Sequence, residues 1–198
     1  MSNRLGDPTA RMLGRLSLNP LVHLDVVGTL MLVMTGRFGW AKPVPFDPRN
    51  LADPRRGMFK IAAAGPASNL ILAIGCGMIV RILIGYGWGT EIQSGFIHVL
   101  GKIFAMGVIM NLSLAFFNLI PLPPLDGSKI LMGLAPPAWD RALFNLERIG
   151  PPILIGLILM GFFVGFSPIW AVMSPFVQTL SFAFTGVPLN ILWALAYA

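Results

Sequence analysis

The chain has 198 residues, of which 56% are hydrophobic and only 11% are charged, and its mean hydropathy is +0.77. These values exclude an ordinary water-soluble domain and indicate a polytopic membrane protein. The net charge of +6 does not indicate nucleic-acid binding, because the basic residues lie in the polar gaps between apolar runs, as the positive-inside rule expects. We therefore expect a lipid bilayer, and no nucleic acid, as the environment of this chain.

Residues 1–57 are predicted to form an interfacial or re-entrant region. Residues 21–34 are apolar but too short to span a bilayer, and they contain His23 and Asp25, whose roles the sequence leaves open. Prolines in the flanking stretches 14–20 and 38–45 favour extended backbone. These two stretches are expected to pair as a small interfacial β element.

Four longer apolar runs follow, each bounded by turn or charge signals, and each is predicted to be a transmembrane helix. They cover residues 58–86, 96–122, 149–166 and 169–197. The linker 37–60 holds six basic and two acidic residues, which places it in the cytoplasm. The stretch 87–95 then lies outside, and 129–148 returns inside as a loop. The expected fold is an all-α polytopic membrane protein with about four transmembrane helices, a short re-entrant segment and the small interfacial β element.

One carboxylate stands at the broken end of the second run, in the sequence Asn118-Leu-Ile-Pro-Leu-Pro-Pro-Leu-Asp126-Gly127. The prolines cannot continue a helix, so the backbone before Asp126 must unwind. An ionisable residue at the edge of a membrane span is costly and points to function. The alternative is an interfacial Asp in a turn or a helix N-cap beside Gly127.

This motif resembles the third-helix signature of the site-2 protease family of intramembrane zinc metalloproteases. Further segments resemble, in the same order, the compact bacterial and archaeal branch of that family, and they cover most of residues 4–131. They are Gly-Asp-Pro-Thr-Ala at 6–10, Gly-Arg-Leu-Ser-Leu-Asn-Pro at 14–20, His-Leu-Asp at 23–25, Gly-Trp-Ala-Lys-Pro-Val-Pro at 39–45 and Ala-Gly-Pro-Ala-Ser-Asn at 64–69. The resemblance implies one membrane-embedded peptidase domain over residues 1–198: an interfacial region (1–57), core helices (58–131) and C-terminal helices (149–198).

The resemblance also implies that Asp126 is a ligand of Zn²⁺ and that Asn118 lines the catalytic site, where its amide reaches the substrate backbone. Zinc would keep a buried carboxylate ionised, since desolvation alone favours the neutral form. An interhelical hydrogen bond without a catalytic part is the alternative role of Asn118.

The chain departs from the family in one large respect, because the His-Glu-x-x-His helix is absent from residues 1–198. That motif supplies two zinc ligands and the glutamate that activates water. Residues 1–5 look like the tail end of this helix, so we expect the given sequence to begin just past it and to be inactive alone. His23 and His98 do not replace it, since neither forms a histidine pair at the spacing that one zinc needs.

The expected function is zinc-dependent hydrolysis of membrane-protein or peptide substrates within or beside the bilayer. A prokaryotic cell membrane, with the site toward the cytoplasm, is the expected location. Two alternatives stay open: a catalytically inactive homologue that binds membrane proteins, and a small membrane transporter. Substrate identity and oligomeric state cannot be read from these residues.

Overall fold

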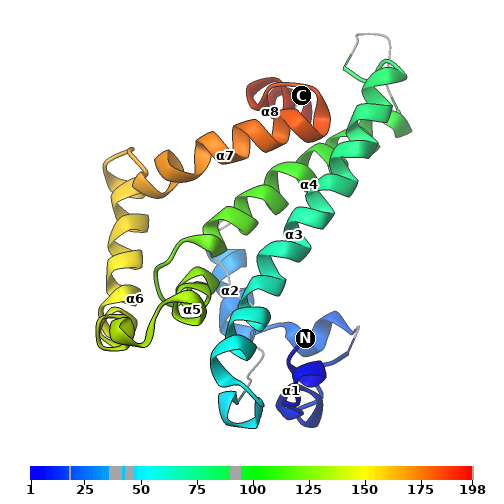
Figure 1. Ribbon diagram of the computed structural model, residues 1–198. Helices are drawn as coiled ribbons and strands as arrows, with labels where there is room; N and C mark the ends of the chain where they lie inside the picture. Colours follow the sequence, from blue (N-terminus) through cyan, green and yellow to red (C-terminus); the bar gives the residue numbers. More distant parts are fainter. Residues whose placement is uncertain (18, 36–41, 43–46, 90–94, 198) are drawn as a thin grey trace. The chain divides into compact units, whose positions relative to one another are not determined.

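The computed structural model describes residues 1–17, 19–35, 42, 47–89 and 95–197, and the chain divides into two compact units, Met1–Ile61 and Ala62–Ala198 (Figure 1). The first unit is built from short helices and the beginning of a long one. They are η1 (Ser2–Leu5), α1 (Thr9–Met12), η2 (Pro20–His23), α2 (Val26–Thr35), η3 (Pro48–Asn50) and the first turns of α3 (Pro54–Gly85).

Asp7 holds the first unit together. Its side chain is fully buried, and its carboxylate accepts hydrogen bonds from the Thr9 hydroxyl and backbone N–H, from the Asp47 N–H at 3.1 Å and from the Asn50 side chain at 3.1 Å. Gly6 precedes it with φ +101°, a conformation that favours glycine, and lies against the Asn50 carbonyl. The carboxylate therefore links two segments that are 40 residues apart in the sequence.

Residues 21–34 were predicted to be too short to span a bilayer, and this is confirmed. Their helix, α2, has ten residues and at 1.5 Å per residue is about 15 Å long. The predicted β element is not seen among the described residues. Within 14–20 the chain instead begins η2 at Pro20, because proline suits the first helical position. Of residues 38–45 only Lys42 is described, and its N–H donates to the His23 carbonyl at 2.9 Å.

The second unit holds the remainder of α3 and the helices that follow it. These are α4 (Phe96–Leu119), α5 (Asp126–Leu134), η4 (Pro137–Trp139), α6 (Asp140–Phe163), α7 (Pro168–Thr185) and α8 (Leu189–Tyr197). By length and composition α3, α4 and η4–α6 qualify as membrane spans, and the pair α7–α8, bent by 73°, adds up to one more. The all-α polytopic fold with about four spans is confirmed.

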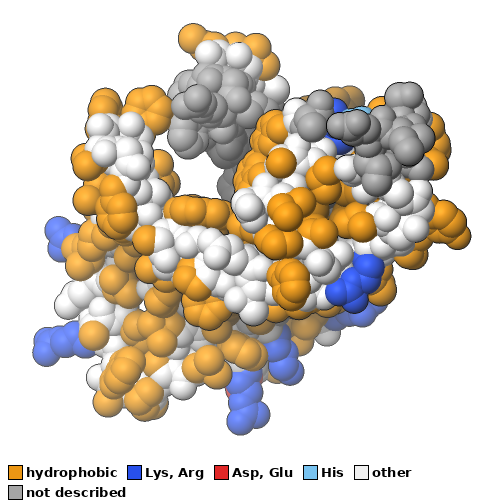
Figure 2. Space-filling model, turned by 90° about the horizontal axis from the view of Figure 1, so that it is seen from above, with side chains coloured by type: hydrophobic (Ala, Val, Ile, Leu, Met, Phe, Trp, Pro, Cys, Tyr) orange, Lys and Arg blue, Asp and Glu red, His pale blue; other side chains and the backbone are white. Residues whose placement is uncertain are grey.

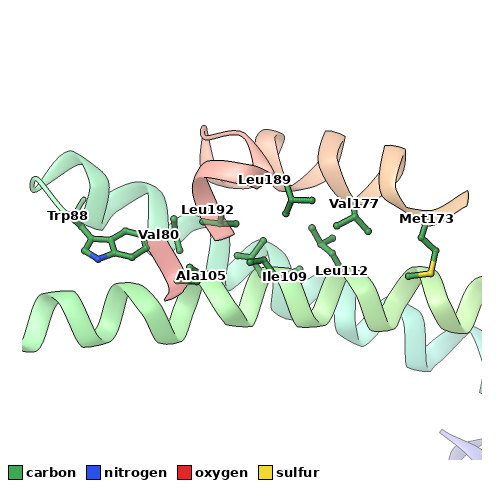
Figure 3. Packing of buried hydrophobic residues seen from close by; sticks show 12 residues of the cluster. Val80, Trp88, Ala105, Ile109, Leu112, Met173, Val177, Leu189 and Leu192 are labelled. Carbon is green, nitrogen blue, oxygen red and sulfur yellow. The ribbon is translucent and has the colours of Figure 1, made fainter. Parts of the chain in front are cut away.

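Helix α4 is the centre of the second unit. It packs against α5, α7 and α8, and its apolar side chains face those of α7 and α8 (Figure 3). Leu112 and Val108 on α4, Val177 on α7 and Leu192 on α8 are fully buried. Small residues let the helices approach closely, as in other membrane bundles.

Residues 129–148 were expected to form a cytoplasmic loop, and the prediction of a loop is wrong because most of them are helical. Lys129 lies in α5, and α6 begins at Asp140, so Glu147 is helical rather than in a loop. The charged residues of this stretch are good helix formers, and they continue the helix beyond its apolar part. Pro151 and Pro152 also lie inside α6.

Hydrophobic side chains remain exposed over much of the molecule, as Figure 2 shows for one face. Among them are Ile71, Met78, Ile103 and Met110, which are exposed by more than half and belong to α3 and α4. A water-soluble protein of this size does not leave such large apolar areas uncovered, so these helix surfaces fit contact with lipid.

Replacement of Gly101 tests the packing of α4. A Cβ at this position would lie 2.1 Å from the ring of Trp88, which is 2% exposed, so Gly101→Ala is expected to destabilise the fold by about 1–3 kcal/mol. Gly75→Ala is the control, because nothing lies within 4 Å of its added Cβ. Reversible unfolding in detergent measures both, and equal stability of the two variants would contradict the packing described here.

Acid sensitivity tests the role of Asp7. Hydrogen bonding, above all from the Thr9 hydroxyl, lowers the pKa of Asp7 from 3.8 to about 2. Since the folded pKa is the lower one, this stabilisation is present above pH 4 and is lost as the pH falls through about 2. The protection of the amides of residues 47–51 from hydrogen exchange, relative to an unfolded chain at the same pH, should therefore fall over this range. Asp7→Asn should remove that part of the pH dependence. The same acid response in both proteins would refute the role.

Candidate functional site

The candidate site is the corner between α4 and α5. Helix α4 ends at Leu119, two residues before Pro121, and residues 120–125 form a turn that contains Pro123 and Pro124. The Leu125 N–H donates to the Leu122 carbonyl at 3.0 Å, which closes the turn. The unwinding before Asp126 that the prolines predict is confirmed, and α5 starts at Asp126 itself.

Two glycines make this corner tight. A Cβ at Gly127 would lie 2.3 Å from the backbone carbonyl oxygens of Leu119 and Ile120, so only glycine fits where α5 meets the end of α4. A Cβ at Gly150 in α6 would lie 2.6 Å from the ring of Pro123. The end of α4, the turn, α5 and α6 therefore converge on one place in the second unit (Figure 1).

Asp126 is half-buried in this corner. One of its carboxylate oxygens lies 3.1 Å from the position that a Cβ of Gly65 on α3 would take. The absence of a side chain at Gly65 thus leaves the space that the carboxylate fills. The Gly-Pro-Ala-Ser-Asn segment of α3 and the Leu-Asp-Gly segment of α5, about 60 residues apart in the sequence, meet here.

The Asp126 carboxylate accepts no hydrogen bond from the described residues, and it does not cap α5, whose N-cap is Leu125. The N-cap hydrogen bond is therefore not formed, although Asp126 does lie in the first turn of α5. Helix α5 lies outside the candidate spans, and burial there raises the pKa of Asp126 above its ordinary value, opposed by the charge of Lys129. A desolvated carboxylate without hydrogen bonds is suited to binding a cation.

Asn118 lies in the last turn of α4, on the other side of the turn from Asp126. Its side chain is half-buried and has no hydrogen-bond partner among the described residues, so the interhelical bond considered as an alternative is not formed there. An apolar groove of about 300 Å³ runs beside this helix end. It is lined by Phe116, Leu119, Ile120, Pro121, Val172, Met173 and Phe176.

The histidines are engaged elsewhere. The Nε2 atom of His23 donates to the Ser17 carbonyl at 2.9 Å, and Asp25 does not bond to it but accepts the Gly28 N–H at the start of α2. His98 lies in the first turn of α4, about 30 Å along the helix from Asn118. The described residues contain no group of three His, Cys, Asp or Glu side chains that could hold a metal ion.

Sequence reasoning missed Arg81, a charged residue near the end of the α3 span. Its guanidinium donates to the Ala183 carbonyl at 3.3 Å and lies beside Gly186, which ends α7 in the left-handed conformation. The cation thus satisfies a terminal carbonyl of α7 and interacts favourably with that end of the helix. Only the isolated charge in an apolar run could have signalled this contact.

Comparison with known proteins decides the family. Residues 29–160 match the model of Peptidase family M50. The zinc metalloprotease YwhC of Bacillus subtilis is 37% identical over 171 residues, which cover 86% of this chain and 76% of that protein. The chain belongs to Peptidase family M50, the site-2 protease family.

More distant M50 relatives are matched over smaller shares of their length. A zinc metalloprotease of Mycolicibacterium smegmatis is 25% identical over 79% of this chain and 58% of its own length. One of Methanocaldococcus jannaschii is 30% identical over 52% of this chain and 44% of its own length. No solved structure matches the chain.

Membership of M50 makes the chain a zinc metallopeptidase by family, with Zn²⁺ as the family cofactor. The described residues do not by themselves compose a zinc site, because a catalytic zinc centre takes three protein ligands and these residues hold no group of three His, Cys, Asp or Glu side chains.

Metal analysis tests this conclusion. We expect the purified 198-residue chain to retain zinc at well below one ion per chain after dialysis, because a single carboxylate satisfies only one of four coordination positions. Inductively coupled plasma mass spectrometry gives the stoichiometry. Stoichiometric zinc that resists a chelator would show that residues of this chain, or of a second copy, complete a site.

Proposed function

We propose that this M50 chain forms the membrane part of a protease that hydrolyses peptide bonds of membrane proteins within or beside the bilayer. The family supports peptide hydrolysis. The helices long and apolar enough to cross a membrane support a substrate that reaches the enzyme from the bilayer.

The observation that carries the proposal is the burial, hydrogen bonding and position of the Asp126 carboxylate. Its carboxylate is half-buried against Gly65, takes no hydrogen bond from the described residues, and stands where the backbone unwinds at the end of a span. Non-helical backbone at membrane depth persists only where it is buried in protein or lines a water-filled cavity. Asp126 would contribute one ligand to zinc, which when bound supplies a Lewis acid and an activated water.

Asn118 would position the substrate. Its amide offers two donors and one acceptor, the groups that an unwound peptide backbone needs. The apolar groove at the same end of α4, which Asn118 does not line, would take an apolar side chain of the same substrate segment. The stacked rings of Phe116 and Phe176, 5.3 Å apart, help to build its wall. Asn118 and the groove thus offer polar and apolar contacts at one end of α4.

The proposed location is a prokaryotic cell membrane with Asp126 toward the cytoplasm. The support is the charge of the chain that leads into α3, which includes Arg49, Arg55, Arg56 and Lys60. A binding protein without catalysis is the second candidate, and the lack of a three-ligand group among the described residues favours it.

Substitutions at the two site residues separate these candidates. In native membranes, with a His-Glu-x-x-His helix joined ahead of residue 1, Asp126→Ala should abolish cleavage of a reporter substrate. Asn118→Ala should lower turnover by about two to three orders of magnitude, as loss of one transition-state donor does. Both variants should insert and fold normally, because neither side chain fills the core described above.

Asn111→Ala is the matched control, since Asn111 lies on the same helix and bonds only to the Gly107 carbonyl of its own helix. Its activity should stay within about threefold of the parent. Full cleavage by the Asp126 variant would end the protease proposal, whereas unimpaired substrate capture without any cleavage by the parent would favour the binding protein.

A further inference from the structure

A small basic pocket lies in the first unit, where α3 begins. It has a volume of about 250 Å³ and is lined by Leu5, Leu51, Ala52, Asp53, Arg56, Gly57 and Lys60. Its floor is well packed, because Leu51 is 5% exposed and lies where a Cβ of Gly57 would be 2.7 Å away. The peptidase proposal assigns no role to this pocket.

The pocket combines positive charge with an apolar wall. Arg56 and Lys60 are one helical turn apart and therefore lie on the same face of α3. Asp53 is also in the pocket, but it accepts the Arg56 N–H at 3.0 Å and pairs with the Arg56 guanidinium at 3.5 Å. Lys60 forms no ion pair with any residue that the structure describes. The pocket thus has a net positive charge beside apolar side chains.

The length of α3 sets the depth of this pocket. Residues 61–80 are twenty consecutive uncharged residues, bracketed by Lys60 and Arg81, and about twenty residues cross the hydrocarbon core. The remaining turns of this 32-residue helix, which carry Arg56 and Lys60, therefore extend past the core into the headgroup region. Lipid phosphates occupy that level.

The charge of the first unit matches an anionic lipid surface. Residues 1–61 contain nine Lys and Arg against four Asp, whereas residues 62–198 contain five against four acidic residues. The same unit exposes apolar side chains on α2, among them Val26 at 85% and Val33 at 76%. Basic charge together with exposed apolar surface is typical of proteins that bind anionic membrane interfaces.

We propose that this pocket binds the headgroup of an anionic phospholipid, with Arg56 and Lys60 holding the phosphate and Leu5 and Leu51 contacting the glycerol and the start of an acyl chain. A pocket of this size is somewhat smaller than a drug-sized ligand site and accommodates part of a lipid. The site is independent of proteolysis and of zinc.

The test uses the full chain in a neutral detergent, titrated with short-chain phosphatidylglycerol and followed by thermal stability. Phosphatidylglycerol should raise the melting temperature, since a ligand that binds only the folded state stabilises it. The Arg56→Gln, Lys60→Gln double variant should bind about thirtyfold more weakly, because each basic residue near an anionic lipid contributes about fivefold. Its melting temperature without lipid should equal that of the parent, since both side chains are exposed.

The matched control is Arg4→Gln, Arg11→Gln, which removes the same charge from exposed positions of the same unit outside the pocket. The affinity of this control for phosphatidylglycerol should stay within about threefold of that of the parent. An equal loss of affinity in both double variants would contradict binding in the pocket and indicate general attraction between the basic unit and the lipid. Phosphatidylcholine at the same concentration should bind at least tenfold more weakly, and equal binding would overturn the anionic selectivity. Inorganic phosphate should fail to displace the lipid at equal concentration, and full displacement would show a free-anion site instead.

Discussion

The close approach of backbone at the corner before Asp126 is the constraint on which the candidate site depends. Gly127 lets α5 touch the carbonyl oxygens at the end of α4, and Gly150 lets α6 touch Pro123. Gly65 leaves room on α3 for the carboxylate. A methyl group at Gly127 or Gly150 would meet an occupied space, and one at Gly65 would lie 3.1 Å from the Asp126 carboxylate. The close packing of the corner thus depends on glycines, which have no side chain. The prolines of the turn prevent α4 from continuing through it.

The same corner explains why an unpaired carboxylate persists there. A buried polar group normally finds a hydrogen-bond partner, and each exception in a native fold needs an explanation. Asp126 accepts no hydrogen bond from the described residues, and burial raises its pKa while the charge of Lys129 opposes this. Asn118 across the turn is likewise without a partner among the described residues. Asp126 and Asn118 thus place two half-buried polar groups on either side of one turn, and the proposed zinc and substrate contacts rest on this placement.

Much of this arrangement could be predicted from local sequence patterns. The apolar runs located α3, α4 and the bent α7–α8 pair, and the prolines located the break before Asp126. The contact between Gly65 and Asp126 could not be predicted from composition or periodicity. It depends on the absence of a side chain at Gly65, and the two residues are about 60 positions apart in the sequence. Arg81 and Asp7 were missed for a related reason. Arg81 bonds to the Ala183 carbonyl, and Asp7 bonds to Asp47 and Asn50, and all of these partners are 40 or more residues away in the sequence. The start of α6 was misplaced because its charged first turns were taken as a loop.

The positions of Lys60, Gly65 and Arg81 on α3 indicate how deep in the bilayer the proposed catalytic centre lies. Lys60 and Arg81 bracket twenty uncharged residues, so the proposed lipid site fixes the level of α3 at one interface. Gly65 lies five residues inside Lys60, which is about 8 Å along the helix axis. Since the Asp126 carboxylate lies against Gly65, the proposed catalytic centre is near the interface rather than at the midplane of the bilayer. A substrate helix then needs to unwind only near its end, where its backbone is already close to water and the cost of breaking its hydrogen bonds is lowest.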